Sequence, residues 1–180
     1  MAKATGAIER LEGGGLSVHL DDATQTAALR YFVRDGAFAA AVQESIGVLP
    51  EGLQAAETRD GALILAWRSP TETLVLTADP ARLSDLEARV AEAADGCLVN
   101  LSGGLRVLRV TGERISDLLC RLGGTGSIPR PGEARRGRMA DVPVLALCVR
   151  AGETLLVVDR AYTEHLMGWV RETLLDFPDS

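Results

Sequence analysis

The densest group of chemically active side chains is a set of four arginines within nine residues: Arg130, Arg135, Arg136 and Arg138. A guanidinium binds carboxylates and phosphates through paired, charge-assisted hydrogen bonds. In a chain of net charge −6, this local positive charge predicts a contact with an acidic patch on a partner, or with a small anion. The alternative is a solvated loop that is rich in arginine by composition, because the chain has eighteen arginines and one lysine.

The other side chains that could do chemistry are isolated from one another. His19, expected in a mobile arm, and His165 are the only histidines, and neither has Cys, Asp or Glu at the spacing of metal ligands. Cys97, Cys120 and Cys148 are widely separated and form no CxxC pair, so we interpret them as reduced core residues. No local signature of a catalytic nucleophile is present. We therefore expect no metal site and no catalytic residues in this chain.

A glycine run at residues 123–126 is the one segment that could be taken for a phosphate-binding loop. It follows a predicted helix and leads to Pro129, whereas dinucleotide-binding loops follow a strand and open a helix. No P-loop pattern occurs either. We therefore interpret the run as a helix stop, and expect no cofactor-binding residues.

Composition excludes several classes of function. With 47% apolar and 24% charged residues the chain is an ordinary globular protein, and its acidity argues against nucleic-acid binding. No segment is long and apolar enough for a membrane span or a signal peptide, so we expect a cytoplasmic protein. The charge is uneven: residues 1–95 carry −7 and residues 96–180 carry +1. Such asymmetry fits a protein whose two faces meet different surroundings.

Two stretches about eighty residues apart repeat the plan strand, tight turn, strand, helix. Residues 61–76 precede a helix predicted from about Leu83, and residues 142–158 precede one from about Ala161. A Glu-Thr-Leu segment begins the second strand in both, at Glu72 and at Glu153. This internal repeat predicts a duplicated α+β fold.

The remaining pattern completes each half as βαββα. We predict a strand at 26–33, a helix that Asp35 caps, and a second helix opened by the capping box at 84–87. The second half has predicted strands at 98–101 and 105–110, a helix at 113–122 and a long loop at 123–139. We expect an arm at residues 1–24 and two ferredoxin-like halves at 25–95 and 96–180.

Four segments in order resemble the gamma subunit of heterotetrameric sarcosine oxidase. Residues 38–50 resemble the family's first helix and the Leu-Pro after it. Residues 65–72, with Trp67 and Pro70, resemble its first hairpin, and residues 99–112 resemble a strand followed by a helix junction. Residues 160–169 resemble its C-terminal helix.

The resemblance implies a folate-binding or aminomethyltransferase-like fold, related to that of the glycine-cleavage T-protein. It implies a heterotetramer that demethylates sarcosine to glycine. In it the alpha, beta and delta subunits are the partners, and the other chains hold FAD, FMN, NAD and tetrahydrofolate. The gamma chain is then a non-catalytic structural subunit. We expect Trp67 and the four arginines to be its partner contacts.

Two other functions stay open from the sequence. A stand-alone folate-binding or aminomethyltransferase-like protein would need a pterin pocket with a buried carboxylate. A small-ligand regulatory module would carry symmetric sites at its two hairpins.

Overall fold

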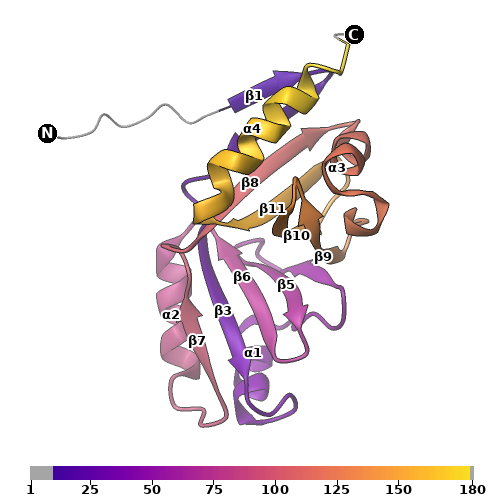
Figure 1. The fold of residues 1–180 in the computed structure, drawn as a ribbon. Coiled ribbons are helices and arrows are strands. Elements are labelled where there is room, and N and C mark those ends of the chain that lie inside the picture. The colour runs from indigo at the N-terminus through magenta and orange to yellow at the C-terminus, as the bar shows by residue number, and fades with distance from the viewer. Residues whose placement is uncertain (1–9, 179–180) are drawn as a thin grey trace, which may run out of the picture.

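The structure is a computed structural model that describes residues 10–178. Within that range, the chain forms two antiparallel sheets, four α-helices and two short 3-10 helices (Figure 1). The first sheet has the strands β3 (Gln25–Tyr31), β4 (Ala55–Glu57), β5 (Ile64–Ser69), β6 (Glu72–Thr77) and β7 (Gly96–Asn100). The second sheet has β1 (Arg10–Gly13), β2 (Leu16–Leu20), β8 (Leu105–Gly112), β9 (Glu133–Met139), β10 (Val142–Cys148) and β11 (Glu153–Asp159). The helices are α1 (Ala37–Ile46), α2 (Pro80–Val90), α3 (Ile115–Gly123), η1 (Thr125–Ser127), η2 (Arg160–Tyr162) and α4 (Thr163–Leu174).

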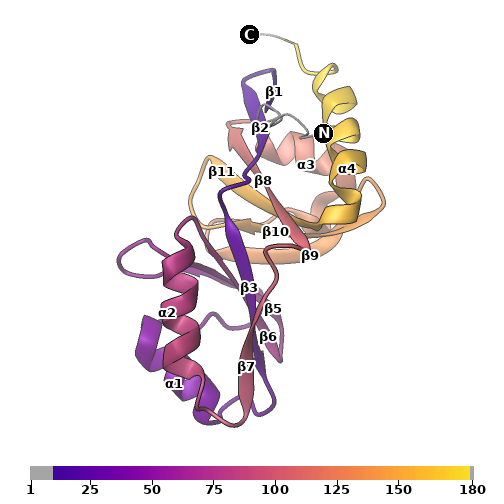
Figure 2. The ribbon, with the colours of Figure 1, turned by 90° about the vertical axis from the view of Figure 1, so that its left-hand side faces the viewer.

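The two sheets lie one above the other, with the helices on their outer faces (Figures 1 and 2). The helices α1 and α2 pack on the first sheet, α3 and α4 pack on the second, and a third apolar core lies between the sheets. In β10, Leu145 and Leu147 face the first sheet, whereas Val144 and Ala146 face the helices. Because successive side chains point to opposite faces and both faces are covered, β10 is almost continuously apolar in sequence.

The predicted repeat and the α+β fold are confirmed. The hairpin β5–β6 recurs as β10–β11, and each lies beside the first long strand of its half, β3 or β8. Each half also has a further strand that pairs with that long strand: β7 pairs with β3, and β2 pairs with β8. A βαββα unit leaves one side of its first strand open, and these two strands fill that side. The predicted bounds 25–95 and 96–180 therefore do not coincide with the two sheets.

The predicted arm is wrong for its described part; residues 1–9 lie outside the described residues. Residues 10–20 form a hairpin on the edge of the second sheet. Leu16 and Val18 are buried there. Gly14 and Gly15 form the turn of this hairpin, with φ of 55° and 75°. His19 consequently lies on a strand, opposite Arg109.

Two helix starts differ from those predicted. Asp35 does not cap α1; the Asp95 carboxylate accepts hydrogen bonds from the N–H groups of Ala37 and Phe38, at 2.7 and 2.6 Å. The helix α2 begins at Pro80, and the Asp79 side chain accepts from the Ala81 N–H at 3.0 Å. The predicted capping box at 84–87 therefore lies inside the helix. Proline at the first helical position after an aspartate is the stronger start signal.

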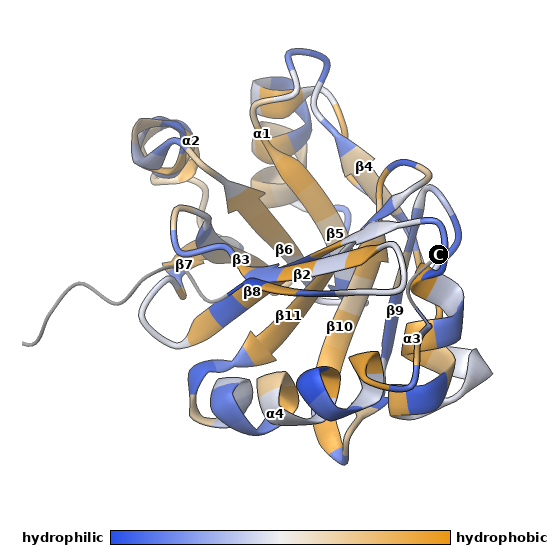
Figure 3. Cartoon of the chain, turned by 90° about the horizontal axis from the view of Figure 1, so that it is seen from above, coloured by the Kyte–Doolittle hydropathy of each residue, from blue (hydrophilic) through white to orange (hydrophobic). Residues whose placement is uncertain are grey.

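The loop predicted at 123–139 contains the strand β9 as its last seven residues. Seven of its residues pair in register with β10, from Met139 opposite Val142 to Glu133 opposite Cys148. Figure 3 shows β9 as a hydrophilic strand beside the hydrophobic β10. An edge strand is held by backbone hydrogen bonds on one side, so it needs no apolar alternation, and its sequence carries little strand signal.

Candidate interaction surface

The structure places the arginine group on and beside an edge strand. Arg135, Arg136 and Arg138 belong to β9, the last strand of the second sheet, and Arg130 lies in the turn before it. The loop before β4 covers the outer side of β9 only at its start, where the Ala134 N–H donates to the Leu53 carbonyl at 2.8 Å. The later part of the edge has no neighbouring strand among the described residues.

The arginines differ in how far their charge is compensated. Arg135 forms an ion pair with Glu133 at 3.0 Å. This hydrogen bond, with one from the Arg130 N–H, lowers the pKa of Glu133. Arg136 donates to the Arg68 carbonyl at 3.4 Å, and Arg138 donates to the Asp141 carbonyl. Within residues 10–178 neither of these two has a carboxylate partner. Their charge is therefore available to an anionic surface.

Trp67 does not lie with the arginines. It is half-buried on β5 and lines a hollow of about 320 Å³ on the helix side of the first sheet. Ala39 and Gln43 of α1 line the same hollow. Arg136 instead lines a hollow of about 250 Å³ at the mouth of the core between the sheets. Arg130 and Arg135 line a third hollow, beside η1, so the five predicted contact residues do not form one surface.

The hollow between the sheets was not foreseen from the sequence. Its mouth carries Arg68 and Arg136, which come from opposite sheets, and Leu74 and Val157 line its apolar part. These residues lie far apart along the chain, so no local pattern could have grouped them.

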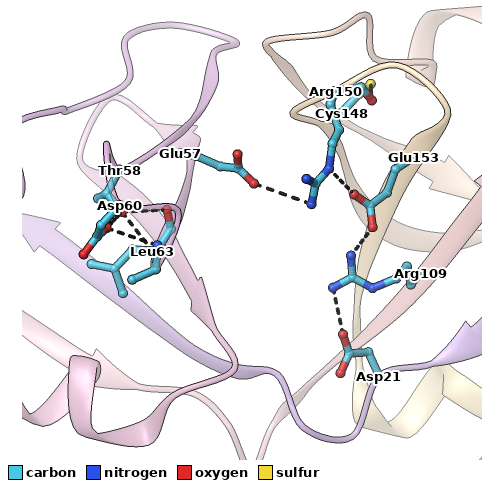
Figure 4. Close-up of polar contacts among 10 residues, drawn as sticks. Asp21, Glu57, Thr58, Asp60, Leu63, Arg109, Cys148, Arg150 and Glu153 are labelled. Carbon is cyan, nitrogen blue, oxygen red and sulfur yellow. Dashed lines mark hydrogen bonds and ion pairs between the residues drawn. The ribbon is translucent and has the colours of Figure 1, made fainter.

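A chain of ion pairs joins the two sheets on their other side (Figure 4). Arg109 on β8 contacts Asp21 at 2.9 Å and also Glu153. Arg150 contacts Glu153 at 2.7 Å and reaches Glu57 of β4 at 3.8 Å. Asp21 lies in the segment between β2 and β3, where the chain passes from the second sheet to the first. The network therefore connects this segment to both sheets.

Opposing effects set the pKa values in this network. Burial tends to raise the pKa of Asp21, but hydrogen bonds from Arg109 and Thr24 outweigh it and hold the pKa below its ordinary value. Burial also acts against the ionised form of Glu153, and hydrogen bonds from Arg150 and Arg109 again lower its pKa. Both carboxylates therefore stay ionised at neutral pH.

The first half carries a related arrangement. Glu72, the counterpart of Glu153 in the repeat, contacts Arg68 and lies 3.6 Å from Arg30 of β3. In both halves, one arginine comes from the hairpin and one from the neighbouring long strand. The repeat therefore extends to its ion pairs.

The histidines and cysteines remain separate in space. His165 contacts the Ala140 carbonyl at 2.9 Å. Cys148 is buried, and burial raises the pKa of its thiol. Cys97 is half-buried and Cys120 is exposed, so the expectation of core cysteines is wrong for Cys120, which lies on the outer side of α3. Among residues 10–178, no group of three or more His, Cys, Asp or Glu residues could hold a metal ion. None of the helices described is long and apolar enough to cross a membrane.

Known structures share this arrangement, although no protein-family model and no curated protein matches the sequence. The fold is that of the folate-binding, aminomethyltransferase-like class. The glycine-cleavage aminomethyltransferase T of Bartonella henselae superposes with a TM-score of 0.65 at 14% identity, over 91% of this chain and 46% of that chain. The chain thus spans about half of that enzyme.

A second solved structure matches over almost its whole chain. It is the heterotetrameric sarcosine oxidase of Corynebacterium sp. U-96, determined in complex with pyrrole 2-carboxylate. The TM-score is 0.81 at 20% identity, over 95% of this chain and 90% of that chain. The protein has the fold of a chain from a sarcosine oxidase complex, as the resemblance in sequence implied.

Proposed function

We propose that this protein is the gamma-type subunit of a heterotetrameric sarcosine oxidase complex, with a structural, non-catalytic role. The observation that carries the proposal is the likeness over nearly the full length of both chains. A shared domain is found in proteins of many functions, whereas agreement from end to end supports an equivalent place in an assembly. The proposed reaction of the complex is the oxidative demethylation of sarcosine to glycine, carried out by its larger subunits.

The partners in this proposal are the alpha, beta and delta subunits, and the location is the cytoplasm. FAD, FMN, NAD and tetrahydrofolate belong to those other chains. This chain contributes a rigid double sheet with an arginine-bearing edge. Arg136 and Arg138 support the docking of an acidic surface there, because both are exposed and neither is paired with a carboxylate within the described residues. Trp67 lies on another face, where it contacts a different part of the assembly.

Charge reversal at this edge tests the docking surface. We expect the double variant Arg136→Glu and Arg138→Glu to reduce co-purification with the partner chains by about tenfold or more, because like charges then face each other. Arg10→Glu is the matched control, since Arg10 is an exposed arginine on β1, at the opposite edge of the same sheet. Equal recovery of partners by the double variant and the control would exclude this surface.

A stand-alone folate-binding protein is the competing function. The aminomethyltransferase fold supports it, but that enzyme is about twice as long as the matched region. Calorimetry with folinic acid separates the two proposals. The assembly role predicts no binding by the isolated chain.

A further inference from the structure

A hollow of about 400 Å³ lies on the first half, away from the arginine edge and the hollow between the sheets. It opens between the end of α1, the outer face of α2 and the turn from β4 to β5. Its floor is apolar and comes from Ile46, Leu63 and Leu86. This volume is within the usual range for small-molecule sites, which are mostly apolar with a few convergent polar groups.

Three guanidinium groups stand around this floor. Arg59 belongs to the turn, whereas Arg82 and Arg89 lie two helical turns apart on α2. Arg82 is engaged by Asp60 at 3.1 Å, and Arg89 reaches only the Ser45 carbonyl, at 3.5 Å. Arg59 has no hydrogen bond or ion pair within the described residues. Two of the three therefore retain donors for a ligand.

The turn that carries Arg59 is held in a fixed shape. The Thr58 hydroxyl donates to the Asp60 carboxylate at 2.7 Å and accepts from the Leu63 N–H at 3.0 Å. Asp60 also accepts from the Ala62 N–H at 3.1 Å (Figure 4). A turn fixed by its own hydrogen bonds loses little conformational entropy when it binds a ligand.

The second half shows that the fold does not require this hollow. There the corresponding turn is only Ala140 and Asp141. The Ala140 N–H donates to the Leu122 carbonyl at 2.7 Å, and its own carbonyl contacts His165 of α4. The short turn thus lies directly against both helices. The first half differs from its repeat by a longer turn, which carries Arg59 and lines the hollow.

We propose that this hollow binds a small amphipathic monoanion, with an apolar body on the floor and its acidic group between Arg59 and Arg89. Asp85 is the remaining lining carboxylate, and with three arginines and two aspartates the rim has a net charge of +1. That charge favours a single acidic group over a dianion. The site uses residues of this chain alone, so the proposal stands apart from the assembly role.

Fluorescence titration of the full chain with 1-anilinonaphthalene-8-sulfonate tests the site. This probe is an aromatic monoanion, and N-phenyl-1-naphthylamine is its neutral analogue. We expect one bound sulfonate per chain and at least tenfold weaker binding of the neutral probe. The double variant Arg59→Gln and Arg89→Gln should weaken sulfonate binding about tenfold. The control Arg136→Gln and Arg138→Gln should stay within about twofold of the parent chain.

A variant that binds the probe more tightly distinguishes an effect on the site from a loss of binding through misfolding. Asp85→Asn removes a negative charge that repels the sulfonate. We expect this variant to bind the probe about two- to fivefold more tightly, still at one probe per chain. Equal binding of the two probes, several probes per chain, or unchanged affinity in both Asp85→Asn and the Arg59 and Arg89 double variant would overturn the proposal.

Discussion

At the scale of single residues, Asp21 and Glu153 are the two carboxylates that Arg109 holds in the ion-pair network. Both are largely removed from solvent, with side chains 15% and 18% exposed, and both contact Arg109. Burial alone would favour their neutral forms, but the guanidinium groups hold the ionised forms. Each therefore gains protons less readily in the folded chain than in the unfolded one.

This difference predicts a stability that falls in acid. A lowered folded-state pKa contributes stability above the unfolded pKa, near 4 for these groups, and that contribution is lost as the pH falls through the folded pKa. We expect Glu153→Gln to cost about 1–3 kcal/mol at pH 7 and to lose less on acidification to pH 3 than the parent chain does. Urea unfolding at both pH values measures this.

The exposed carboxylate of Glu92 is the control for that measurement. Glu92→Gln should follow the parent chain at both pH values. If Glu153→Gln and the parent chain lost the same free energy of unfolding between pH 7 and pH 3, the network would have no part in acid stability.

At the scale of the elements, the sequence predicted those helices and hairpins that are determined by contacts between residues close along the chain. The two hairpins and the last helix follow from apolar spacing and turn residues, and they are confirmed. The strand β9 and the pairing of β2 with β8 depend on partners far along the chain, so their own residues give little sign of them. The arginines could be found from their clustering, but only the sheet register shows that Trp67 lies on another face.

Two different residues are candidates for the cap of α1: Asp35, which is adjacent in sequence, and Asp95, which the structure brings to the helix start. Asp95→Ala removes the acceptor for the Ala37 and Phe38 N–H groups, so we expect a loss of about 0.5–2 kcal/mol in the free energy of unfolding. Asp35→Ala, at the cap expected from sequence, should change it by less than about 0.5 kcal/mol. Denaturant titrations of both variants decide between them. A larger loss of unfolding free energy in Asp35→Ala than in Asp95→Ala would show that Asp35 is the cap.

Close packing beside that cap predicts a second effect. A Cβ at Gly96 would lie 2.3 Å from the Phe38 ring and 2.6 Å from the Arg30 carbonyl oxygen. Because Phe38 is fully buried and the carbonyl belongs to the backbone, we expect Gly96→Ala to cost about 1–3 kcal/mol. Gly103→Ala is the control, since nothing lies within 4 Å of its added Cβ. Similar thermal midpoints for the two variants would contradict this packing.

At the scale of the whole molecule, the two halves share a fold but differ in their surfaces. The second half has the arginine-bearing edge β9, whereas the first half has the hollow beside α2. The outward stripe of α2 carries Arg82, Asp85 and Arg89, and that of η2 and α4 carries Tyr162, His165 and Trp169 at the same spacing. Tyr162 and Trp169 are 46% and 54% exposed. A duplicated scaffold with unlike faces fits a subunit that meets several different neighbours.

Co-purification of the chain from its native host tests the assembly role most directly. The proposal predicts a stable complex in which this chain is present at equal stoichiometry with three other chains, and in which sarcosine oxidase activity and the flavins reside. Size-exclusion chromatography with mass determination of each chain gives that stoichiometry. A monodisperse chain that elutes alone and binds folinic acid by calorimetry would contradict the account.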